Sequence, residues 1–453
     1  MMKKKLLAGL LALALACTGL AGCGSSNGGD SQGKTPDGKT ELTLWSSYTA
    51  ASNAKFEELV KKFNKENAEY SVSLETGQAA SGNRQKLSTS TPEYYPSLFM
   101  GTNNAIYEYA EAEYVAPLQD FIDKDSEDFT EGMLESVKTS YSDTEGKLIG
   151  MPVGVSVKGY MVNLDVLAQT GYTVDDLTSF EKIAAAAQAA FDKGASEYGY
   201  IPGDGSEVLD MLLYQGVGIF DADNGHSGDI TKSMYNEGET KAALTKMAKI
   251  YADMVKSGAC MKNTKGQDAG TATFVNGRSL FWACTSSFVY ELQDVNIEFE
   301  WAFLPFQGVD DNAKHKGSVL AEGTSIFIAN TGDETEMQGA YEFLKFLAKP
   351  ENQIFWSTFR GYTPYTEEAL TSQEWITWRD ENYPSEAKLE EKLKTVNAEL
   401  KFPNATITNK LLDTSFEIVS NIISEPTGDV NTYIENAAEA LNKSIEILQL
   451  RGQ

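Results

Sequence analysis

Hydrophobic residues recur along this chain with two periods, which together predict alternating strands and amphipathic helices. In the helix predicted over residues 54–67, Phe56, Leu59, Val60 and Phe63 fall on one face. Short apolar runs bounded by turn residues predict strands at 41–45, 70–74, 97–100, 149–163, 279–283, 299–304 and 325–328. Helical periodicity marks 177–191, 240–257, 336–348, 387–400, 410–423 and 430–450. The alternation predicts an α/β fold.

The N-terminus carries a different pattern, an apolar run that follows three lysines. Residues 6–16 are apolar, and residues 20–23 read Leu-Ala-Gly-Cys, a small-residue processing site that ends in cysteine. The run is too short for a permanent membrane span, so we expect residues 1–22 to be a lipoprotein signal peptide. Cys23 would then carry two acyl chains such as palmitate, enough for stable anchoring. A plain signal peptide with a chance cysteine is the alternative.

Residues 23–40 are rich in glycine, serine and charge, which predicts a flexible tether. Within it, residues 33–40 match the phosphate-loop pattern of a glycine, four residues and then Gly-Lys-Thr. A phosphate loop needs a strand before it and a helix after it, because backbone amides and the helix terminus converge on the phosphates. Here a linker precedes the match and a predicted strand follows it. We therefore reject nucleotide binding.

Length and charge limit the function classes. The 453 residues include 65 acidic and 38 basic side chains, for a net charge of −27, and 42% are hydrophobic. A chain of this length usually forms more than one hydrophobic core, so we expect two lobes. Such a negative charge repels nucleic acid and anionic lipid surfaces. No nucleic-acid partner is therefore expected, and membrane contact is expected only through the N-terminal lipid.

Few residues are available for metal or nucleophilic chemistry. His226 and His315 are the only histidines, and neither has a neighbour at metal-ligand spacing. Cys260 and Cys284 remain in the mature chain; we expect them to be unpaired thiols, although a disulfide is the alternative. The sequence predicts no cofactor, no metal site and no catalytic residue.

Residues 221–229 resemble the start of a calcium loop. The glycine comes one place early, and the twelfth position from Asp221 is Lys232, where a bidentate glutamate should stand. This excludes an EF-hand. A polar turn is the favoured interpretation, and an irregular calcium loop is the alternative.

From residue 42 to residue 448, the order of motifs resembles that of the family 1 extracellular solute-binding proteins of ABC importers. That family includes maltose-binding and glycerol-phosphate-binding proteins. The opening strand and helix are similar, as is the stretch from Gly150 to Asn163. Further motifs follow in family order, at 274–279, 304–305, 322–325 and 340–353. Each motif alone is weak, but their combined order behind a lipoprotein signal identifies the chain as a member.

The resemblance implies a two-lobed periplasmic-binding-protein-like α/β fold with several interlobe crossings and a ligand cleft that closes by hinge motion. It places lobe 1 at 41–151 and 305–365, and lobe 2 at 152–304 and 366–453. The crossings are expected near Pro152, Leu304 and Tyr365. The implied function is capture of a carbohydrate, a mono- or oligosaccharide, by a lipid-anchored monomer on the extracellular face of a bacterial membrane. The implied partners are the permease subunits of an ABC transporter.

A sugar site needs flat apolar faces for the ring and polar groups for its rim. Aromatic residues at predicted strand ends or loops supply the faces, although core packing is the alternative interpretation of each: Trp45, Tyr48, Tyr214, Trp282 and Tyr362. Matching the family's motifs residue by residue implies a ligand-binding set of Trp45, Ser46, Asn83, Asn103, Ser156, Tyr214, Trp282, Thr285, Ser286, Gly323, Tyr362 and Asn409.

One position departs from the family. Glycerol-phosphate-binding relatives carry a late arginine where this chain has Asn409. A phosphoester is best held by the guanidinium fork, so its absence favours a neutral ligand. Arg84 or Arg360 is a possible substitute. A binder of glycerol phosphate or another anionic solute is therefore the alternative, and a surface glycoside hydrolase with paired carboxylates is the second alternative.

Overall fold

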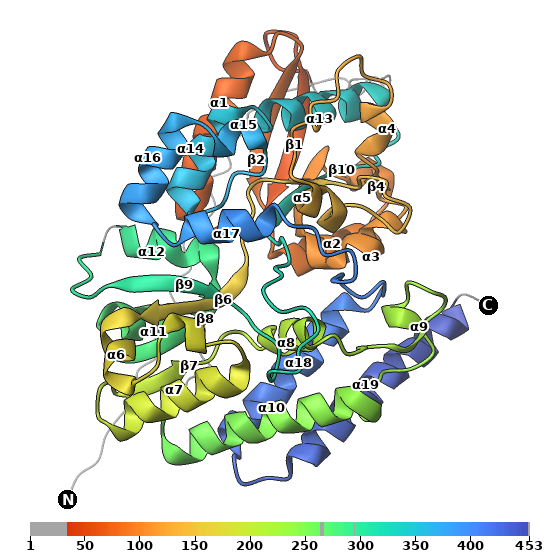
Figure 1. Ribbon diagram of the computed structural model, residues 1–453. Helices are drawn as coiled ribbons and strands as arrows, with labels where there is room; N and C mark the ends of the chain where they lie inside the picture. The colour runs from red at the N-terminus through yellow and green to blue at the C-terminus, as the bar shows by residue number, and fades with distance from the viewer. Residues whose placement is uncertain (1–33, 263–266, 294, 452–453) are drawn as a thin grey trace, which may run out of the picture.

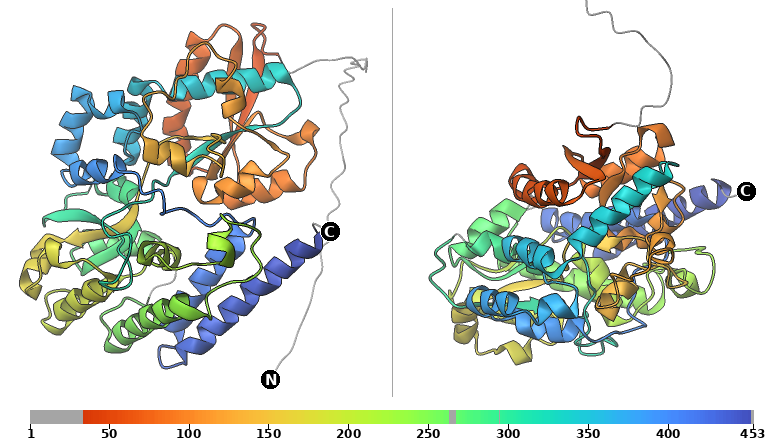
Figure 2. Two further views of the ribbon diagram at one scale, coloured as in Figure 1. Left: turned by 45° about the vertical axis from the view of Figure 1, so that its right-hand side comes forward. Right: turned by 90° about the horizontal axis from the view of Figure 1, so that it is seen from above.

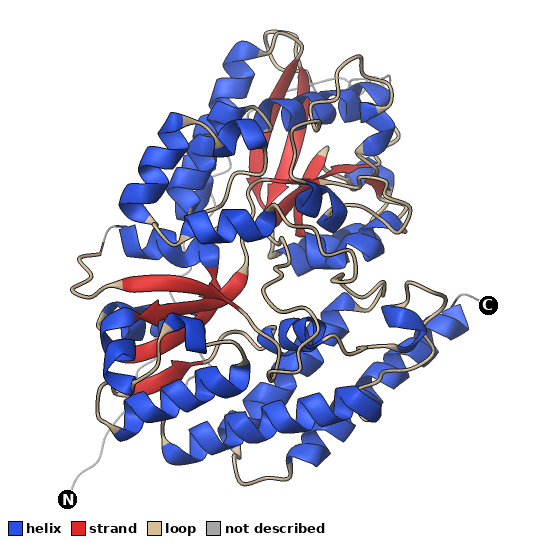
Figure 3. Cartoon of the chain, in the orientation of Figure 1, coloured by secondary structure: helices blue, strands red, loops and turns tan. Residues whose placement is uncertain are grey.

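The computed structural model describes residues 34–262, 267–293 and 295–451, and the described chain forms two α/β lobes. The expected signal peptide and Cys23 lie outside the described residues. Each lobe is built on its own sheet, with helices packed around it (Figures 1 and 3). The predicted two-lobed α/β fold is confirmed.

The first sheet, counted over the described residues, has six strands in the order β2-β1-β3-β10-β4, with β5 paired to β10. β1 is parallel to β2 and β3, whereas β10 runs antiparallel to β3, with Thr324 opposite Thr102. The strands are β1 (Thr40–Ser46), β2 (Tyr70–Thr76), β3 (Leu98–Thr102), β4 (Val115–Ala116), β5 (Met151–Pro152) and β10 (Thr324–Ala329).

The second sheet, again within the described residues, has the order β7-β8-β6-β9. β6 lies between two antiparallel neighbours, and β7 is parallel to β8. Gly159 of β6 allows β9 to approach closely, because a Cβ there would lie 2.2 Å from the carbonyl oxygen of Leu304. The strands are β6 (Lys158–Asn163), β7 (Tyr198–Ile201), β8 (Ser279–Thr285) and β9 (Trp301–Pro305).

Helices cover both sheets. α1 begins at an N-cap, where the Thr49 side chain accepts a hydrogen bond from the Ser52 N–H, and it buries the predicted apolar face around Phe56. Helices α10, α18 and α19 pack together in the second lobe, as the left view of Figure 2 shows. The helices are α1 (Ala50–Glu66), α2 (Ala80–Ser88), α3 (Ile106–Ala110), α4 (Gln119–Ile122), α5 (Glu135–Ser140), α6 (Leu164–Thr170), α7 (Phe180–Asp192), α8 (Glu207–Gln215), α9 (Asp221–Asn224), α10 (Gly238–Ser257), α11 (Gln267–Val275), α12 (Tyr290–Gln293), α13 (Glu334–Leu347), α14 (Pro350–Arg360), α15 (Glu367–Leu370), α16 (Gln373–Asn382), α17 (Glu386–Leu393), α18 (Thr408–Ser424) and α19 (Val430–Arg451). Within the described residues, no helix combines the length and apolar character that a membrane span requires.

The chain passes between the sheets in segments that lie side by side. Residues 153–157 lead from β5 to β6, and residues 306–323 lead from β9 to β10. These two segments pair through an antiparallel bridge between Ser156 and Glu322, and Val155 pairs in the same way with Thr363. We call residues 153–157, 320–324 and 361–365 the crossing segments. Their pairing joins three separate stretches of chain at the junction of the lobes.

After Thr363 the chain stays beside the junction before it reaches α18. Leu134 of the first lobe donates its N–H to the Tyr365 carbonyl, and the Phe303 N–H of β9 donates to Ser385 Oγ. α15 and α16 pack against α14. Residues 394–407 then connect α17 to α18, which packs against α10 and α19 of the second lobe. The residue boundaries expected for the two lobes stay a prediction.

Most predicted elements are confirmed, with boundaries shifted by a few residues. Two predictions differ by more: the helix expected over 387–400 ends at Leu393, where α17 ends, and the strand expected over 149–163 is divided into β5 and β6 by the crossing segment 153–157. β1 follows the phosphate-loop-like residues, as expected, where a nucleotide site would need a helix. Among the elements that the sequence patterns missed are strand β7 and the helices α2, α6, α8, α11, α14 and α16. α8 is buried along its whole length, so it lacks the polar face on which helical periodicity depends.

Candidate functional site

Aromatic and polar side chains gather where the crossing segments meet. Arg360, at the end of α14, lies among three tyrosine rings: its Cζ is 4.0 Å from the Tyr290 ring centroid and 5.7 Å from those of Tyr48 and Tyr362. The Tyr362 hydroxyl lies 3.2 Å from Thr324 Oγ1. We call these five residues the crossing cluster. It joins the first lobe, the crossing segments and α12 of the second lobe.

The crossing cluster contains hydrogen-bonding groups that the described residues leave unsatisfied. Arg360 Nη1 donates to Ser52 Oγ at 3.1 Å, but Arg360 Nε has no partner within the described chain. The Tyr48 hydroxyl is also buried there without a partner, as is that of Tyr141, which neighbours Tyr362. Burial raises the pKa of Tyr48 well above its ordinary value, so its hydroxyl remains neutral. Buried donors without partners are costly, and a polar solute would satisfy them.

A buried ion cluster lies next to the crossing cluster. Lys158 Nζ is 3.0 Å from Glu322 Oε2 and 3.3 Å from Asp210 Oδ2. Burial raises the pKa of Asp210 to about 8, against the opposing effect of Lys158. Burial alone would lower the pKa of Lys158, but Asp210 and Glu322 outweigh it and raise that pKa. The cluster ties β6 and α8 of the second lobe to the crossing segment 320–324.

Two glycines let the crossing segments approach one another. Gly323 has a φ of +155°, and a Cβ there would lie 2.3 Å from the Gly154 carbonyl oxygen. A Cβ on Gly154 would lie 2.6 Å from Cβ of Tyr362. Neither position accepts a side chain without moving backbone. The glycines therefore set the distance between the crossing segments and hold Tyr362 against them.

Several candidates from the sequence contact the crossing segments directly. The Asn103 side-chain amide donates to the Ala321 carbonyl at 2.8 Å, and the Tyr214 hydroxyl accepts from the Leu320 N–H at 3.1 Å. Ser286 exchanges two hydrogen bonds with Val157. The remaining candidates of this group belong to the segments or lie beside Ser286: Ser156, Thr285, Gly323 and Tyr362. The structure thus brings seven of the twelve candidates to one place, and their contact with a ligand stays a prediction.

Other candidates lie apart from the crossing segments. Trp45 donates its indole N–H to Glu75 at 3.1 Å and has Lys86 Nζ 3.5 Å from its ring centroid. The side chains of Ser46 and Asn83 are hydrogen-bonded within the first lobe, to Asn53 Oδ1 and to the Met100 carbonyl. Trp282 is 1% exposed, with Phe274 and Phe288 against its ring. Their surroundings are those of core residues, and their role in binding stays a prediction.

Asn409 makes a contact between the lobes. Arg84 Nη2, from α2 of the first lobe, donates a hydrogen bond to Asn409 Oδ1 at the start of α18. Arg84 Nε is also 3.2 Å from Glu108 Oε1. Arginine therefore does stand beside Asn409, but it comes from the other lobe and its charge is balanced by a carboxylate. We call this contact the interlobe bridge.

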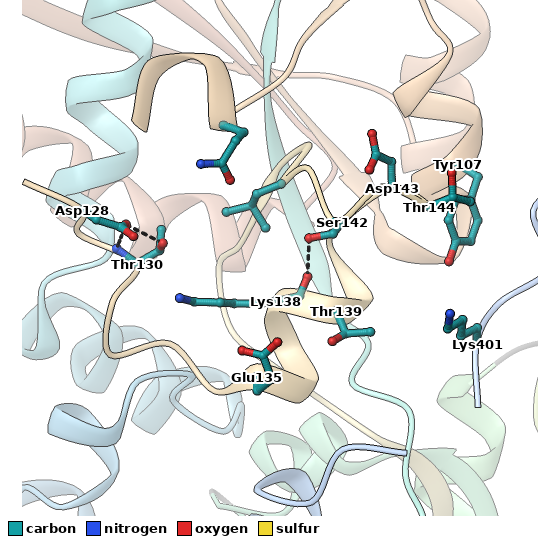
Figure 4. A pocket seen from close by; sticks show the side chains of 13 residues that line it. Tyr107, Asp128, Thr130, Glu135, Lys138, Thr139, Ser142, Asp143, Thr144 and Lys401 are labelled. Carbon is teal, nitrogen blue, oxygen red and sulfur yellow. Dashed lines mark hydrogen bonds between the residues drawn. The ribbon is translucent and has the colours of Figure 1, made fainter. Parts of the chain in front are cut away.

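Two polar pockets open at the edge of the lobe junction. One, of about 300 Å³, is lined by α5 and the loop after it, and Lys401 enters it from a separate segment on the side of Tyr107 (Figure 4). The other, of about 420 Å³, lies on the second lobe and includes His226, His315 and again Lys401. The Tyr107 and His226 rings meet edge to face with their centroids 5.2 Å apart. The two pockets are therefore neighbours across the junction.

Sequence reasoning missed part of this site. Asp210 carried a usable signal, since it interrupts a continuous apolar run that became α8. Glu322 and Thr324 flank Gly323 within a motif that had been recognised. Tyr290 and Lys158 carried no local signal, because their partners come from distant stretches of chain.

The calcium-loop pattern folds as a polar turn. Asp221 accepts hydrogen bonds from the Thr231 side chain and from the N–H groups of Thr231 and Lys232. Across the described ranges, no group of three or more His, Cys, Asp or Glu side chains could hold a metal ion. Cys260 and Cys284 are both buried and free, and burial raises the pKa of each thiol.

Comparison with known proteins agrees with this architecture. The chain is 22% identical over 352 residues to the sn-glycerol-3-phosphate-binding periplasmic protein UgpB of Yersinia pestis, covering 74% of this chain and 76% of that protein. The sugar-binding protein MalE of Xanthomonas citri superposes with a TM-score of 0.71 at 16% identity, covering 91% of this chain and 98% of that one. An ABC substrate-binding protein of Listeria monocytogenes in complex with cycloalternan also gives 0.71, at 20% identity over 90% of this chain and 99% of that one.

The structural neighbours establish the two-lobed fold. The family model for bacterial extracellular solute-binding proteins matches residues 58–385, well over half of the chain. The chain therefore belongs to the bacterial extracellular solute-binding protein family.

Proposed function

We propose that this protein captures a carbohydrate at the crossing cluster and delivers it to the permease of an ABC importer. Family membership makes it an extracellular or periplasmic solute-binding protein. The observation that carries the carbohydrate assignment is the crossing cluster, where three tyrosine rings surround the Arg360 guanidinium and buried donors have no partner in the described chain. Aromatic faces with a few fixed polar groups suit the weakly polar faces and hydroxyl rim of a sugar.

The mechanism is conformational. A solute that contacts both lobes at the crossing cluster favours the closed arrangement, because its contacts with the second lobe exist only when the lobes are together. Paired crossing segments guide that motion, and the interlobe bridge between Arg84 and Asn409 adds a contact to the closed form. The closed pair of lobes is the form that docks on the permease.

The anchoring and oligomeric state belong to the same proposal. Cys23 carries the lipid after removal of residues 1–22, and the protein works as a monomer on the extracellular face of the membrane. Relatives named for binding rather than catalysis support a protein without enzymatic turnover. A glycoside hydrolase would consume its sugar, whereas this protein is expected to return it unchanged.

A glycerol-phosphate binder is the second candidate, and two observations favour it. The curated relatives carry that name at 22% identity, and Arg84 stands beside Asn409, where an arginine would hold a phosphate. Against it, Glu108 already balances the charge of Arg84. A bound phosphate would have to displace or tolerate that carboxylate, so we favour the neutral ligand.

Thermal unfolding with a solute panel tests the assignment. Purified protein is heated with neutral mono- and oligosaccharides and, separately, with sn-glycerol 3-phosphate. A ligand at one hundred times its dissociation constant should stabilise the fold by about 2.7 kcal/mol. Stabilisation by a neutral sugar that is recovered intact supports the proposal. Stabilisation by glycerol phosphate alone transfers the assignment to the second candidate, and hydrolysis of the sugar rejects both.

A further inference from the structure

The first lobe places an arginine and a carboxylate together where it faces the second lobe. Arg84 on α2 comes after β2, and Glu108 on α3 comes after β3. Both strands are parallel to β1, so the two side chains follow the carboxyl ends of neighbouring parallel strands, the edge at which open α/β sheets bind ligands. Figure 1 shows α2 and α3 on the side of the first lobe that faces the second. We call Arg84 and Glu108 the internal pair.

The same edge of the sheet leads from the internal pair to the crossing cluster. Tyr48 of that cluster follows β1 and donates its N–H to Ser46 Oγ at 3.1 Å. The Ser46 hydroxyl also lies 3.3 Å from the Met100 sulfur on β3, and the Asn83 amide donates to the Met100 carbonyl at 3.3 Å. Asn83 immediately precedes Arg84. A solute held at the crossing cluster therefore lies along the edge that ends at the internal pair.

Glu108 neutralises an arginine that has little contact with water. Arg84 Nε lies 3.2 Å from Glu108 Oε1, and the two side chains are 5% and 24% exposed. Burial raises the pKa of Glu108, while Arg84 and a hydrogen bond with Thr408 act in the opposite direction. A buried guanidinium without a counter-charge would be costly, so the carboxylate meets a need that a ligand would otherwise meet. Its exposed part remains accessible to a solute.

The second lobe brings the start of a long helix to the same place. α18 begins at Thr408, and Ile407, its N-cap residue, supplies no side-chain acceptor to the first turn. Arg84 donates a hydrogen bond to Asn409 in that turn. A guanidinium and a helix N-terminus both attract anions. Glu108 is the anion present, since it pairs with Arg84 and is hydrogen-bonded with Thr408.

We infer that Glu108 is a specificity-determining residue, which excludes anionic solutes because it fills the anion position between Arg84 and the start of α18. This role rests on the proposed carbohydrate function, and it names the residue that sets the charge of the solute. A phosphate or carboxylate on the solute would have to share one guanidinium with Glu108, and like charges repel strongly where water is scarce. A neutral hydroxyl can donate to the carboxylate and accept from the guanidinium, so the internal pair admits a sugar.

Calorimetric titration with sn-glycerol 3-phosphate and with inorganic phosphate tests this role. Glu108→Gln keeps the shape of the side chain and removes its charge. We expect it to raise the affinity for both anions by roughly tenfold or more over the parent protein, because Arg84 becomes free to bond a charged acceptor. In Glu108→Gln/Arg84→Met the gain should disappear. Glu111→Gln, which removes the same charge from an exposed position three residues later, is the matched control and should bind like the parent.

Each contrary result would overturn the role of Glu108. Parent protein that binds sn-glycerol 3-phosphate as tightly as Glu108→Gln shows no exclusion. An equal gain in Glu111→Gln assigns the effect to net charge, and a gain that survives the loss of Arg84 places the anion elsewhere. Glu108→Ala should show the same gain as Glu108→Gln. If circular dichroism finds neither variant folded, Glu108 is a requirement of folding and does not select the solute.

The carbohydrate function is decided by different solutes. Neutral sugars are tested on the parent protein by thermal unfolding, whereas the role of Glu108 is tested by the two anions on its variants. Stabilisation by a sugar without any gain in Glu108→Gln rejects the role of Glu108 alone. A gain in Glu108→Gln without stabilisation by any sugar keeps the exclusion of anions and rejects the carbohydrate assignment.

Discussion

The crossing cluster is polar, and so are the two pockets at the lobe junction that share Lys401, which we call the rim groove. The two regions relate to folding in opposite ways. In the crossing cluster and the neighbouring ion cluster, charged groups are buried and held by other parts of the chain, as Lys158 is held by Asp210 and Glu322. In the rim groove, Glu135 and Lys401 are exposed and have no partner in the described chain. Changes in the first region should therefore affect stability and binding together, whereas changes in the groove should leave stability unchanged.

The largest expected effect comes from removing the cation of the buried ion cluster. Lys158→Ala takes the cation away from the buried carboxyl groups of Asp210 and Glu322, and breaking a buried pair in this way costs about 3–5 kcal/mol. Urea unfolding at pH 7 measures the loss. The double variant Lys158→Met/Asp210→Asn should recover part of it, since it removes Lys158 together with one of its two carboxylate partners. Equal stability of Lys158→Ala and the parent protein would contradict the burial of this charge.

Next in size is the loss of the guanidinium from the crossing cluster. Arg360→Ala removes the donors that a bound solute would use, and hydrogen bonds to charged groups are worth about 1.5–3 kcal/mol each. We expect a fall in affinity of at least tenfold for short and long solutes alike, measured by titration calorimetry. Arg278→Ala is the matched control, because Arg278 is exposed and pairs at the surface with Glu197. Unchanged affinity in Arg360→Ala would place the solute outside the crossing cluster.

A buried carboxyl beside the crossing segments predicts a pH dependence that the groove lacks. Burial raises the pKa of Glu386 from 4.5 to about 8, and one of its oxygens accepts from the Thr363 hydroxyl. The pKa of Glu386 is higher in the folded than in the unfolded protein, so the protonated carboxyl favours the folded state. This contribution to the free energy of unfolding is complete below pH 4.5 and is lost as the pH rises to 8. Each pKa unit is worth about 1.4 kcal/mol.

Melting temperatures between pH 4.5 and 9 check the Glu386 prediction. Glu386→Gln keeps the neutral shape, so its stability should fall less over that interval than the parent's. Glu135→Gln, in the exposed groove, should leave the parent profile unchanged. Parallel profiles for the parent protein and Glu386→Gln would show that this carboxyl is ionised in the fold.

The smallest expected effect concerns the interlobe bridge. A single hydrogen bond contributes about 0.5–1.5 kcal/mol, so Arg84→Ala and Asn409→Ala should each reduce the closed population modestly. Small-angle scattering with and without solute reports that population through the radius of gyration. If the two residues act on each other, the double variant should reduce the closed population by less than the sum of the reductions in the two single variants. If the two reductions simply add, Arg84 influences the closed population through its ion pair with Glu108 and not through Asn409.

Local patterns were enough to predict most of the fold, because amphipathic helices such as α1 and strands such as β1 show their burial in their own sequence. They failed for α8, where burial on every side removes the periodic signal. At the site, motif order found Gly323 and Tyr362, but Tyr290 and Lys158 acquire their neighbours only through the tertiary fold. Aromatic residues are equally suited to cores and clefts, which is why the sequence did not separate Trp282 from Tyr362.

The pairing of the crossing segments has a consequence for the path of motion. Lobes joined by one flexible linker would tumble about many axes. Here Val155 is paired with Thr363 and Ser156 with Glu322, so relative rotation must twist this small ladder as a unit. Torsion about a line through the ladder is soft, whereas sideways shear would break backbone hydrogen bonds. We therefore expect the lobes to rotate mainly about this ladder, so that each opening would return the two halves of the site to the same alignment.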